Sequence, residues 1–307
     1  MKRTPALFLI VSTLVIGFIS CKKDSTDNNN SNNNNNNTAP DSNYVDRIYI
    51  IDSTASGEDT SQLEIYTYDN LKRVTTIVDS MLTPTPELFA FKQFEYSGSD
   101  SLPFKSTLYV YDGNVNFDTV ITYHYFDNTG KLVKDSIINI NKSTSPSYYQ
   151  IRQRVLNITY SAGMMYGFTR DSAMFVNNVP STSPAIITTD TITLDANANM
   201  IHTIQHRSTT VYTTTNSFDN HPHPFKALNI FMCWGVNIFQ NSYYDPTEPN
   251  TNNITHVVET GTGSTPYNHD FALFNSYYSN GFLKTTAHPQ PAGSPDYEKY
   301  LFVYKSL

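Results

Sequence analysis

Apolar and polar residues alternate with a period of two along much of the chain beyond residue 44. In residues 63–68 (LEIYTY), one side of an extended segment would carry Leu and Ile, and the other would carry Glu and two Tyr. Residues 121–125, 156–160 and 300–304 repeat this alternation with aliphatic or aromatic side chains. No long window has the i, i+3, i+4, i+7 spacing of an amphipathic helix. The pattern therefore predicts β-strands with one apolar row.

Turn segments follow many of these predicted strands, and most of them begin with an aromatic residue. They are rich in Asp, Asn, Ser and Gly, which tolerate the positive φ angles of tight hairpins. They recur at intervals of roughly 24–35 residues up to residue 218, as in a repeated two-stranded unit. The segments are 68–70, 96–98, 125–130, 160–163, 194–197, 218–220 and 278–281.

Repetition of such hairpins predicts an all-β fold, a large antiparallel meander of roughly twelve to fourteen strands. A sheet of that size curls or closes, so we expect a barrel-like sheet. The sequence does not choose between an open curved sheet and a closed barrel. The composition agrees, because 22 Tyr, 18 Phe and only 15% charged residues are typical of sheet proteins.

The N-terminal segment differs from the rest. Lys2 and Arg3 precede a short apolar run, residues 6–20, which is the length of a secretory signal and short for a bilayer span. Residues 18–21 (FISC) resemble the lipobox of bacterial lipoproteins. The resemblance implies that Cys21 receives a diacylglyceryl group and becomes the first residue of the mature protein. The alternative is that Cys21 ends an uncleaved membrane helix.

An Asn-rich segment follows Cys21 and has too few apolar residues to order itself. Its Cys-Lys-Lys-Asp start is similar to the export signal of surface lipoproteins in Bacteroidetes-type bacteria, which implies an outer-membrane lipoprotein on the periplasmic face or the cell surface. We therefore predict three parts: a lipoprotein signal peptide (1–20), a lipid-anchored disordered tether (21–44) and a single antiparallel β domain (45–307).

The net charge and the cysteine content limit the classes of partner and the disulfides that we expect. Removal of residues 1–20 takes away Lys2 and Arg3 and changes the formal net charge from −7 to −9. An acidic protein lacks the basic surface that nucleic acids require, so we expect none as a partner. The membrane partner is expected through the Cys21 anchor alone. Cys233 would then be the only thiol left, so no intrachain disulfide is expected, and its apolar surroundings favour a buried position.

Several segments resemble a known family. Residues 66–74 and 123–132 resemble the tyrosine–aspartate hairpins of Bacteroidetes-type envelope lipoproteins. Residues 218–228 (FDNHPHPFKAL) are similar to the YDNKPNPFKGL segment of one such family, an uncharacterised domain described as porin-like in fold. The final hairpin, residues 277–304, is similar as well. The resemblance implies a fold and an envelope location, but no activity. We expect Phe225 to fill the core at a corner.

The sequence indicates no catalytic residue, no cofactor site and no metal site. His202 and His206 lie on one strand, where four residues span roughly 13 Å, so they are too far apart to share an ion and are interpreted as solvent-facing. No nucleophile elbow, phosphate-binding loop or zinc-protease motif occurs. Five aromatic residues are instead candidates for stacking on a glycan or a protein partner, with burial in the core as the alternative. They are Tyr148, Tyr149, Trp234, Tyr243 and Tyr244.

The sequence therefore favours a non-enzymatic, lipid-anchored cell-envelope protein that binds a glycan or a protein partner or has a structural role. The alternative is a hydrolase acting on polysaccharide through paired carboxylates at the loop end of the sheet. A transmembrane barrel is disfavoured, because membrane strands need an apolar outward row, and these strands carry Thr, Asn, Lys and Asp freely.

Overall fold

A computed structural model of the chain describes ten segments. The chain divides into two compact units, Met1–Thr38 and Ala39–Leu307, and every described residue belongs to the second. The predicted signal peptide, the tether except for its last residue and Cys233 lie outside these residues, as does the anchor Cys21. In the described part of the chain, no helix has the length and hydrophobicity to cross a membrane. The segments are 44–54, 57–83, 85–112, 115–142, 149–181, 187–207, 210–225, 250–262, 266–289 and 297–307.

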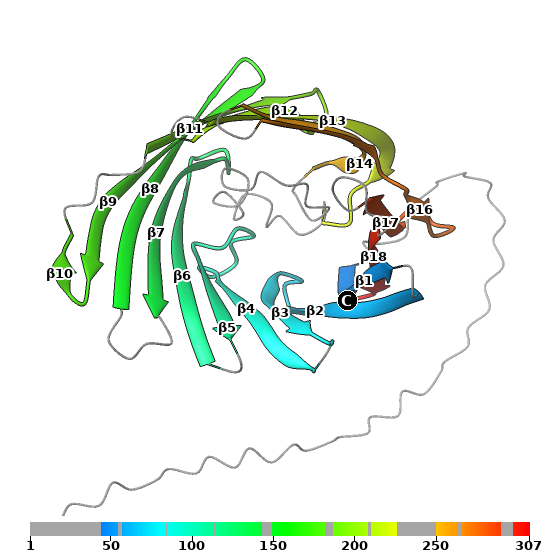
Figure 1. Ribbon diagram of the computed structural model, residues 1–307, viewed down its shortest axis with the longest axis horizontal. Helices are drawn as coiled ribbons and strands as arrows, with labels where there is room; N and C mark the ends of the chain where they lie inside the picture. Colours follow the sequence, from blue (N-terminus) through cyan, green and yellow to red (C-terminus); the bar gives the residue numbers. More distant parts are fainter. Residues whose placement is uncertain are drawn as a thin grey trace, which may run out of the picture. The chain divides into compact units, whose positions relative to one another are not determined.

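The described residues form one antiparallel sheet of 18 strands (Figure 1). The strands are β1 (Tyr44–Thr54), β2 (Gly57–Tyr68), β3 (Val74–Met81), β4 (Glu87–Glu95), β5 (Lys105–Asp112), β6 (Val115–Phe126), β7 (Leu132–Lys142), β8 (Tyr149–Ser161), β9 (Met164–Val176), β10 (Val179–Pro180), β11 (Ile187–Leu194), β12 (Met200–Arg207), β13 (Thr210–Pro222), β14 (Asn252–Thr262), β15 (Tyr267–Ala272), β16 (Ser276–Tyr277), β17 (Leu283–Pro289) and β18 (Tyr297–Lys305).

Neighbours in sequence pair along most of the sheet. Ladders run from β1 to β9, from β9 to β11 and on to β15, and from β16 to β18. The last strand, β18, pairs with β1, so the sheet curls back on itself (Figure 1). Between β15 and β17 the described residues form no ladder, and the Phe274 N–H instead donates to the Ala287 carbonyl oxygen at 2.9 Å. The sheet is therefore curled but not closed by continuous pairing.

The predicted all-β antiparallel fold is confirmed, and the number of strands exceeds the twelve to fourteen expected. The extra strands have sequences that hide the alternation. β15 (YNHDFA) carries Asn, His or Asp at half of its positions, and β10 and β16 contain only two residues each. Pairing with neighbours, rather than their own hydrophobic pattern, makes these segments strands.

Several predicted turns share one construction, a five-residue loop that ends in a bulge. In the loop after β2, the carboxylate of Asp69 accepts hydrogen bonds from the N–H groups of Leu71 and Arg73, at 2.9 and 3.0 Å. The Lys72 N–H donates to the Asp69 carbonyl oxygen, and Lys72 has a φ of +62°. The same backbone pattern occurs at residues 69–73, 127–131, 195–199 and 278–282.

The turn expected at residues 218–220 is not a hairpin. β13 continues to Pro222, and its register against β14 shifts between Phe218 and Pro222. The Asp219 carboxylate accepts hydrogen bonds from the His221 N–H at 2.9 Å and from the Asn253 N–H at 3.2 Å. Because that carboxylate bridges to β14, the segment bulges along the neighbouring strand and does not turn back.

The fourth position of these loops offers a test of backbone strain. Ala198 holds a φ of +66°, which costs an L-residue with a Cβ about 1 kcal/mol. Ala198→Gly should therefore raise the free energy of unfolding by about 1 kcal/mol, measured by urea denaturation. The reverse change at the equivalent position, Gly130→Ala, should lower it by a similar amount. A Cβ at Gly130 would meet only Leu102 Cδ1, at an ordinary 3.6 Å, so the backbone would be the cause. Loss of stability in Ala198→Gly would contradict the strain.

Five tyrosine hydroxyls donate hydrogen bonds from the ends of strands or from loops to backbone carbonyl groups of other strands. The Tyr96 hydroxyl donates to the Val74 carbonyl oxygen at 2.8 Å, and the Tyr160 hydroxyl donates to that of Leu132 at 3.0 Å. Burial raises the pKa of Tyr160 to about 12, so the hydroxyl stays protonated and keeps its donor. Tyr68, Tyr278 and Tyr304 donate in the same way to Val45, Phe302 and Leu283, at 2.6, 2.9 and 2.8 Å.

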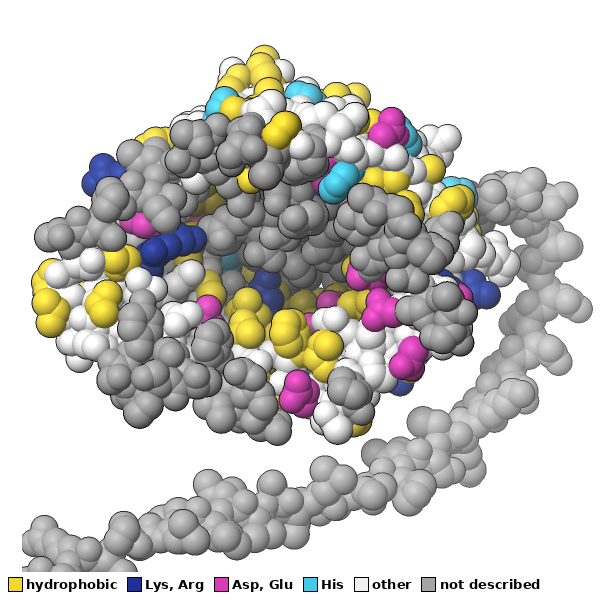
Figure 2. Space-filling model, viewed as in Figure 1, with side chains coloured by type: hydrophobic (Ala, Val, Ile, Leu, Met, Phe, Trp, Pro, Cys, Tyr) yellow, Lys and Arg dark blue, Asp and Glu magenta, His cyan; other side chains and the backbone are white. Residues whose placement is uncertain are grey.

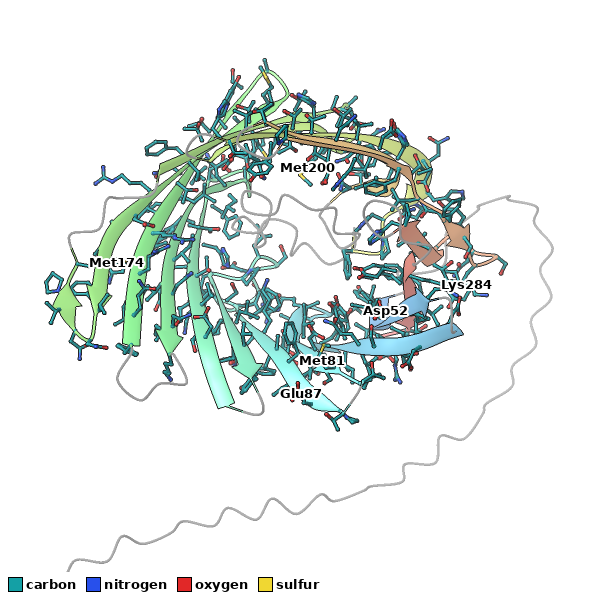
Figure 3. All side chains as sticks on the ribbon, viewed as in Figure 1. Asp52, Met81, Glu87, Met174, Met200 and Lys284 are labelled. Carbon is teal, nitrogen blue, oxygen red and sulfur yellow. The ribbon has the colours of Figure 1, made fainter. Side chains whose placement is uncertain are left out.

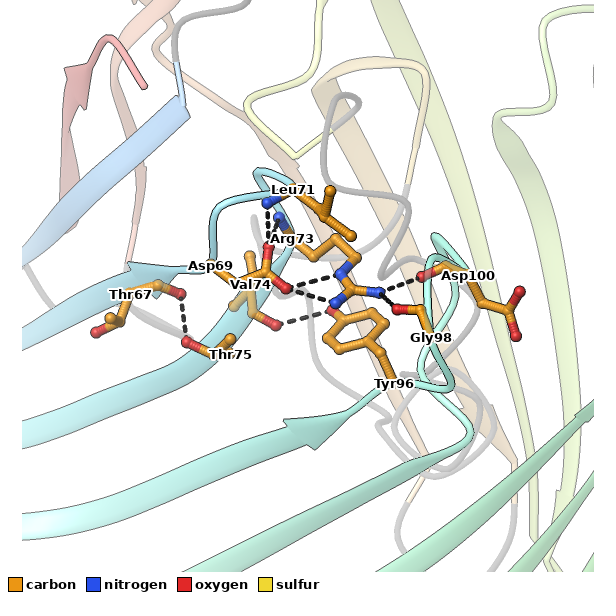
Figure 4. A network of polar contacts seen from close by, with 9 residues as sticks. All are labelled: Thr67, Asp69, Leu71, Arg73, Val74, Thr75, Tyr96, Gly98 and Asp100. Carbon is orange, nitrogen blue, oxygen red and sulfur yellow. Dashed lines mark hydrogen bonds and ion pairs between the residues drawn. The ribbon is translucent and has the colours of Figure 1, made fainter.

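One loop is further tied to the next by an arginine (Figure 4). The Arg73 guanidinium forms an ion pair with Asp69 at 2.6 Å and donates to the carbonyl oxygens of Gly98 and Asp100, both at 2.8 Å. It also lies over the Tyr96 ring, 4.4 Å from its centroid. The aspartates of both tyrosine–aspartate motifs therefore shape their loops, and in the first motif Tyr68 also links β2 to β1.

The hydrophobic core lies on one face of the sheet, which we call the concave face. Ile48, Tyr66 and Phe302 of three neighbouring strands are buried in one cluster. As predicted, Phe225 is buried there, with its ring centroid 5.7 Å from that of Tyr66. A second cluster contains Leu132, Ile137, Leu156, Ile158, Met165, Ile192 and Met200, and a third contains Ile254, Val257 and Leu273.

Candidate functional site

Strand register decides which polar side chains share the concave face with the core. Tyr66 pairs with Ile77, so two residues further along the same strands Glu64 pairs with Asp79 on the same face. Figure 3 shows side chains on both faces, with Met200 on the inner side of the curled sheet. By the same reasoning the concave face carries Asp52, Glu64, Asp79, Lys92, Asp118, His124, Asp135, Arg152, Arg154, Asp171, Asp190, Glu259, His269, His288 and Glu298.

The opposite, convex face is apolar along one part of the sheet and polar along another. From β4 to β9 it carries Phe91, Tyr109, Ile121, Tyr123, Tyr125, Ile138, Ile140, Ile151, Val155, Tyr166 and Phe168. From β11 to β14 it carries Thr189, Thr191, Thr193, His202, His206, Thr213, Thr215 and Thr260. The convex row of β4–β9 also contains Glu95, Lys105, Lys134, Lys142 and Arg170, so the pleat divides the charged residues of these strands between the two faces. On β11–β14 it leaves hydroxyl and imidazole groups outward.

Three concave side chains form a buried hydrogen-bonded chain across β5, β6 and β7. Ser106 Oγ lies 3.0 Å from His124 Nε2, and His124 Nδ1 lies 2.8 Å from Asp135 Oδ1. The residues are 5%, 5% and 0% exposed. Burial raises the pKa of Asp135, while the hydrogen bond from His124 and the charge of Lys92 oppose that rise.

The order Ser–His–Asp matches that of acyl-transfer enzymes, but the surroundings do not. Ser106 lies inside a strand that is paired with both neighbours, opposite Phe94 in β4 and Thr122 in β6. Its backbone N–H lies within a ladder, so it is not an oxyanion-hole donor. Because the three side chains are also closed to solvent, we interpret the chain as a structural polar network.

Two carboxyl groups on the concave face have strongly raised pKa values. Burial raises the pKa of Asp79 to about 6, although Gln62 Nε2 opposes this by donating to both of its oxygens at 2.8 and 2.7 Å. Burial raises the pKa of Glu259 to about 7, although the charge of His288 opposes this. His269 Nδ1 lies 3.8 Å from Glu259 Oε2. Both carboxyl groups therefore keep their protons to a higher pH than solvent-exposed carboxyl groups do.

A third polar group contains aromatic rings. His288 Nε2 lies 3.4 Å from Glu298 Oε1. The His288 ring lies near those of Phe271 and Tyr300, with centroids 6.0 and 6.4 Å apart. The Tyr300 hydroxyl donates a hydrogen bond to the Glu298 carboxylate. Carboxylates and ring faces thus meet where β15, β17 and β18 come together, a grouping that no sequence motif indicated.

A fourth group is basic. Arg152 and Arg154 occupy alternate positions of β8 and approach the single carboxylate of Asp171 in β9, at 3.7 and 3.1 Å. The sequence showed only the spacing Arg-Gln-Arg, and its partner depends on the register of β8 against β9.

One of the five candidate stacking aromatics can be placed. Tyr149 is the first residue of β8, is half-buried and pairs with Lys142. Its neighbour Gln150 belongs to the concave row, so Tyr149 lies on the convex side. Its N–H donates to Asn177 Oδ1 at 2.8 Å. The other four, Tyr148, Trp234, Tyr243 and Tyr244, lie outside the described residues, so the stacking role of the five stays a prediction.

The two histidines that the sequence singled out share the convex face. His202 and His206 pair with Thr193 and Thr189 in β11. His202 Nδ1 lies 3.0 Å from Thr215 Oγ1, and His206 is exposed. Among the described residues, no group of three or more His, Cys, Asp and Glu side chains is arranged to hold a metal ion.

Comparison with known proteins gave matches to structures only. No protein-family model and no curated protein matches the chain. A porin-like protein from Bacteroides vulgatus is similar with a TM-score of 0.49 and 10% identity, over 87% of this chain and 100% of that chain. A porin-like protein from Bacteroides uniformis has a TM-score of 0.32 and 12% identity, over 85% and 98%. The resemblance to an envelope lipoprotein family stays a prediction.

Proposed function

We propose that this protein is a lipid-anchored outer-membrane protein whose concave face binds a glycan without cleaving it. The supporting observation is the collection of carboxyl and amide groups beside aromatic rings on that face. Gln62, Glu64 and Asp79 form one such group, and Glu298 with Tyr300 forms another. Carboxylates and amides bind sugar hydroxyls, and ring faces stack on the apolar faces of sugars.

The convex face supports an anchored protein over a spanning one. A barrel that crosses a bilayer presents an apolar outward band on every strand. β4–β9 have such residues, but the convex row of β11 includes Thr189, Thr191 and Thr193, and β12 adds His202 and His206. Attachment through Cys21 does not require any strand to face lipid.

The anchor is tested by Cys21→Ser in the producing bacterium. The unchanged protein should incorporate radiolabelled palmitate and sediment with membranes, whereas Cys21→Ser should lose the label and the membrane association. Cys233→Ser is the control and should keep both. Palmitate incorporation in Cys21→Ser equal to that of the unchanged protein would contradict the anchor. Peptidase treatment of intact cells then distinguishes the periplasmic face from the cell surface.

Glycan binding is tested by a glycan array and a reducing-end assay on the purified mature protein. We expect retention of at least one glycan without release of reducing ends. Replacing Glu64 and Asp79 by Gln and Asn should weaken that binding at least tenfold. Gln93→Ala, an exposed convex residue of β4, should leave it unchanged. Release of reducing ends over time would support the hydrolase instead, and no retention on the array would refute glycan binding.

A further inference from the structure

Arg152 and Arg154 form an incompletely neutralised pair on the concave face. They face one side of β8, opposite Asn139 and Ile137 in β7. Of their ion pairs with Asp171, only that of Arg154 Nε, at 3.1 Å, is a hydrogen bond. Arg152 Nε lies 3.7 Å from the same carboxylate, beyond hydrogen-bond distance. Among the described residues, two guanidinium groups therefore share one carboxylate, and these three side chains together have a charge of about +1.

Arg152 lacks good acceptors. Its Nε atom is buried and has no hydrogen-bond partner among the described residues. Its Nη2 atom lies 3.7 Å from Met174 Sδ, and a thioether sulfur is a weak acceptor. Gln150 Nε2 donates to the same sulfur at 3.2 Å. Among the described residues around Arg152, hydrogen-bond donors therefore outnumber strong acceptors. A buried donor without a partner lowers the stability of the fold, unless a bound ligand supplies the missing acceptor.

The positive charges of Arg152 and Arg154 also repel each other. Burial is the main cause that lowers the pKa of Arg154; Asp171 opposes it, and the charge of Arg152 lowers it further. The guanidinium side chains are 25% and 16% exposed, so solutes can reach them. Figure 2 shows Lys and Arg side chains at the left edge of the hollow in this face and Asp and Glu side chains mainly on the other side.

From this geometry we propose that Arg152 and Arg154 bind a carboxylate group of the ligand, so that the glycan is an acidic, uronate-containing one. The inference rests on the proposed glycan-binding function and specifies its ligand. A guanidinium group can donate two parallel hydrogen bonds, from two of its N–H groups, to the two oxygens of one carboxylate. One carboxylate would neutralise the excess charge of this group, whereas a phosphate dianion would reverse it. The carboxylate would also give Arg152 an acceptor that the described residues do not supply to its Nε atom.

The test is calorimetric titration of the purified mature protein with an oligogalacturonate and with a neutral malto-oligosaccharide of equal length. The oligogalacturonate should bind, and the neutral oligosaccharide should bind at least tenfold more weakly. Raising the salt concentration from 50 to 500 mM should weaken oligogalacturonate binding severalfold, because the charges are partly exposed.

Variants locate the site. Arg152→Met keeps the length of the side chain, removes its charge and should weaken oligogalacturonate binding at least tenfold. Arg154→Lys keeps the charge, removes the fork and should weaken binding by a smaller factor. Arg170→Met is the matched control, because Arg170 is an exposed arginine on the convex face of β9, and its affinity should be unchanged. Unchanged thermal midpoints confirm that each variant is folded.

The outcomes separate this inference from the proposed function. Unchanged oligogalacturonate affinity in both Arg152→Met and Arg154→Lys would overturn the carboxylate site. Neutral glycans bound as tightly as the oligogalacturonate would overturn it as well, while leaving glycan binding intact. Retention of no glycan of either kind would refute both proposals.

Discussion

Asp135→Ala is expected to lower the free energy of unfolding by about 3–5 kcal/mol, measured by urea denaturation. Asp135 is fully buried and accepts the hydrogen bond from His124 Nδ1, while His124 Nε2 bonds Ser106. Removing the carboxyl group leaves a buried ring N–H without an acceptor and creates a cavity next to it. Few single changes on the described sheet combine both effects.

Two further variants separate hydrogen bonding from charge. Asp135→Asn keeps an acceptor for His124, and because burial already favours the neutral carboxyl group, it should cost much less than Asp135→Ala. Ser136→Ala, the next residue along β7 and on the convex side, should change the stability by less than about 0.5 kcal/mol. An Asp135→Ala variant as stable as Ser136→Ala would show that the network does not hold β5–β7 together.

The stability of the domain is expected to fall as the pH rises from 5 to 8. The raised pKa values of Asp79, about 6, and Glu259, about 7, mean that the folded state holds these protons where the unfolded chain has released them. The free energy of unfolding therefore decreases with pH from the unfolded pKa values of about 4 up through the folded ones. A tenfold difference in proton affinity corresponds to about 1.4 kcal/mol, and solvent contact of Asp79 reduces the combined effect to about 2–3 kcal/mol.

Urea denaturation at pH 5, 6, 7 and 8 measures this slope. Combining Asp79→Asn with Glu259→Gln should flatten it, since neither replacement titrates. Asp127→Asn is the control. Hydrogen bonds from Thr129 and Lys131 lower the pKa of Asp127, so titration of this group affects the stability only below pH 4. The decrease in stability above pH 5 should therefore persist in this variant. A slope that is the same in the double variant and in the unchanged protein would assign the pH dependence to other groups.

The polar sites show what the sequence could not predict. Ser106, His124 and Asp135 come from three strands, and only the pairing of those strands brings them into one chain of hydrogen bonds. If one strand shifted by one residue against its neighbour, all of its side chains would move to the opposite face of the sheet. The spacing of these residues along the sequence therefore cannot show that they meet. Asp171 likewise reaches Arg154 through a bulge between β8 and β9, and a bulge leaves little trace in a single sequence.

The sequence alone also did not show which face of the sheet the charged residues of the strands occupy. In the sequence they weighed against membrane strands, because Lys and Asp interrupt the apolar runs. In the sheet, Lys92 and Asp135 point to the concave face, and neighbours such as Phe91 and Ile138 point to the convex face. A spanning barrel would place the convex threonines and histidines of β11 and β12 against lipid.

By itself, the sequence determined the all-β class, the hairpin units and most tight loops, because alternation and the turn preferences of Asp, Asn and Gly act over a few residues. It also indicated the lipid anchor, which remains a prediction. Only the tertiary structure decided that β18 returns to β1, that residues 219–222 bulge along β14, and which charges meet on the concave face. These features depend on register between strands, and register is set by packing and pairing across the whole sheet.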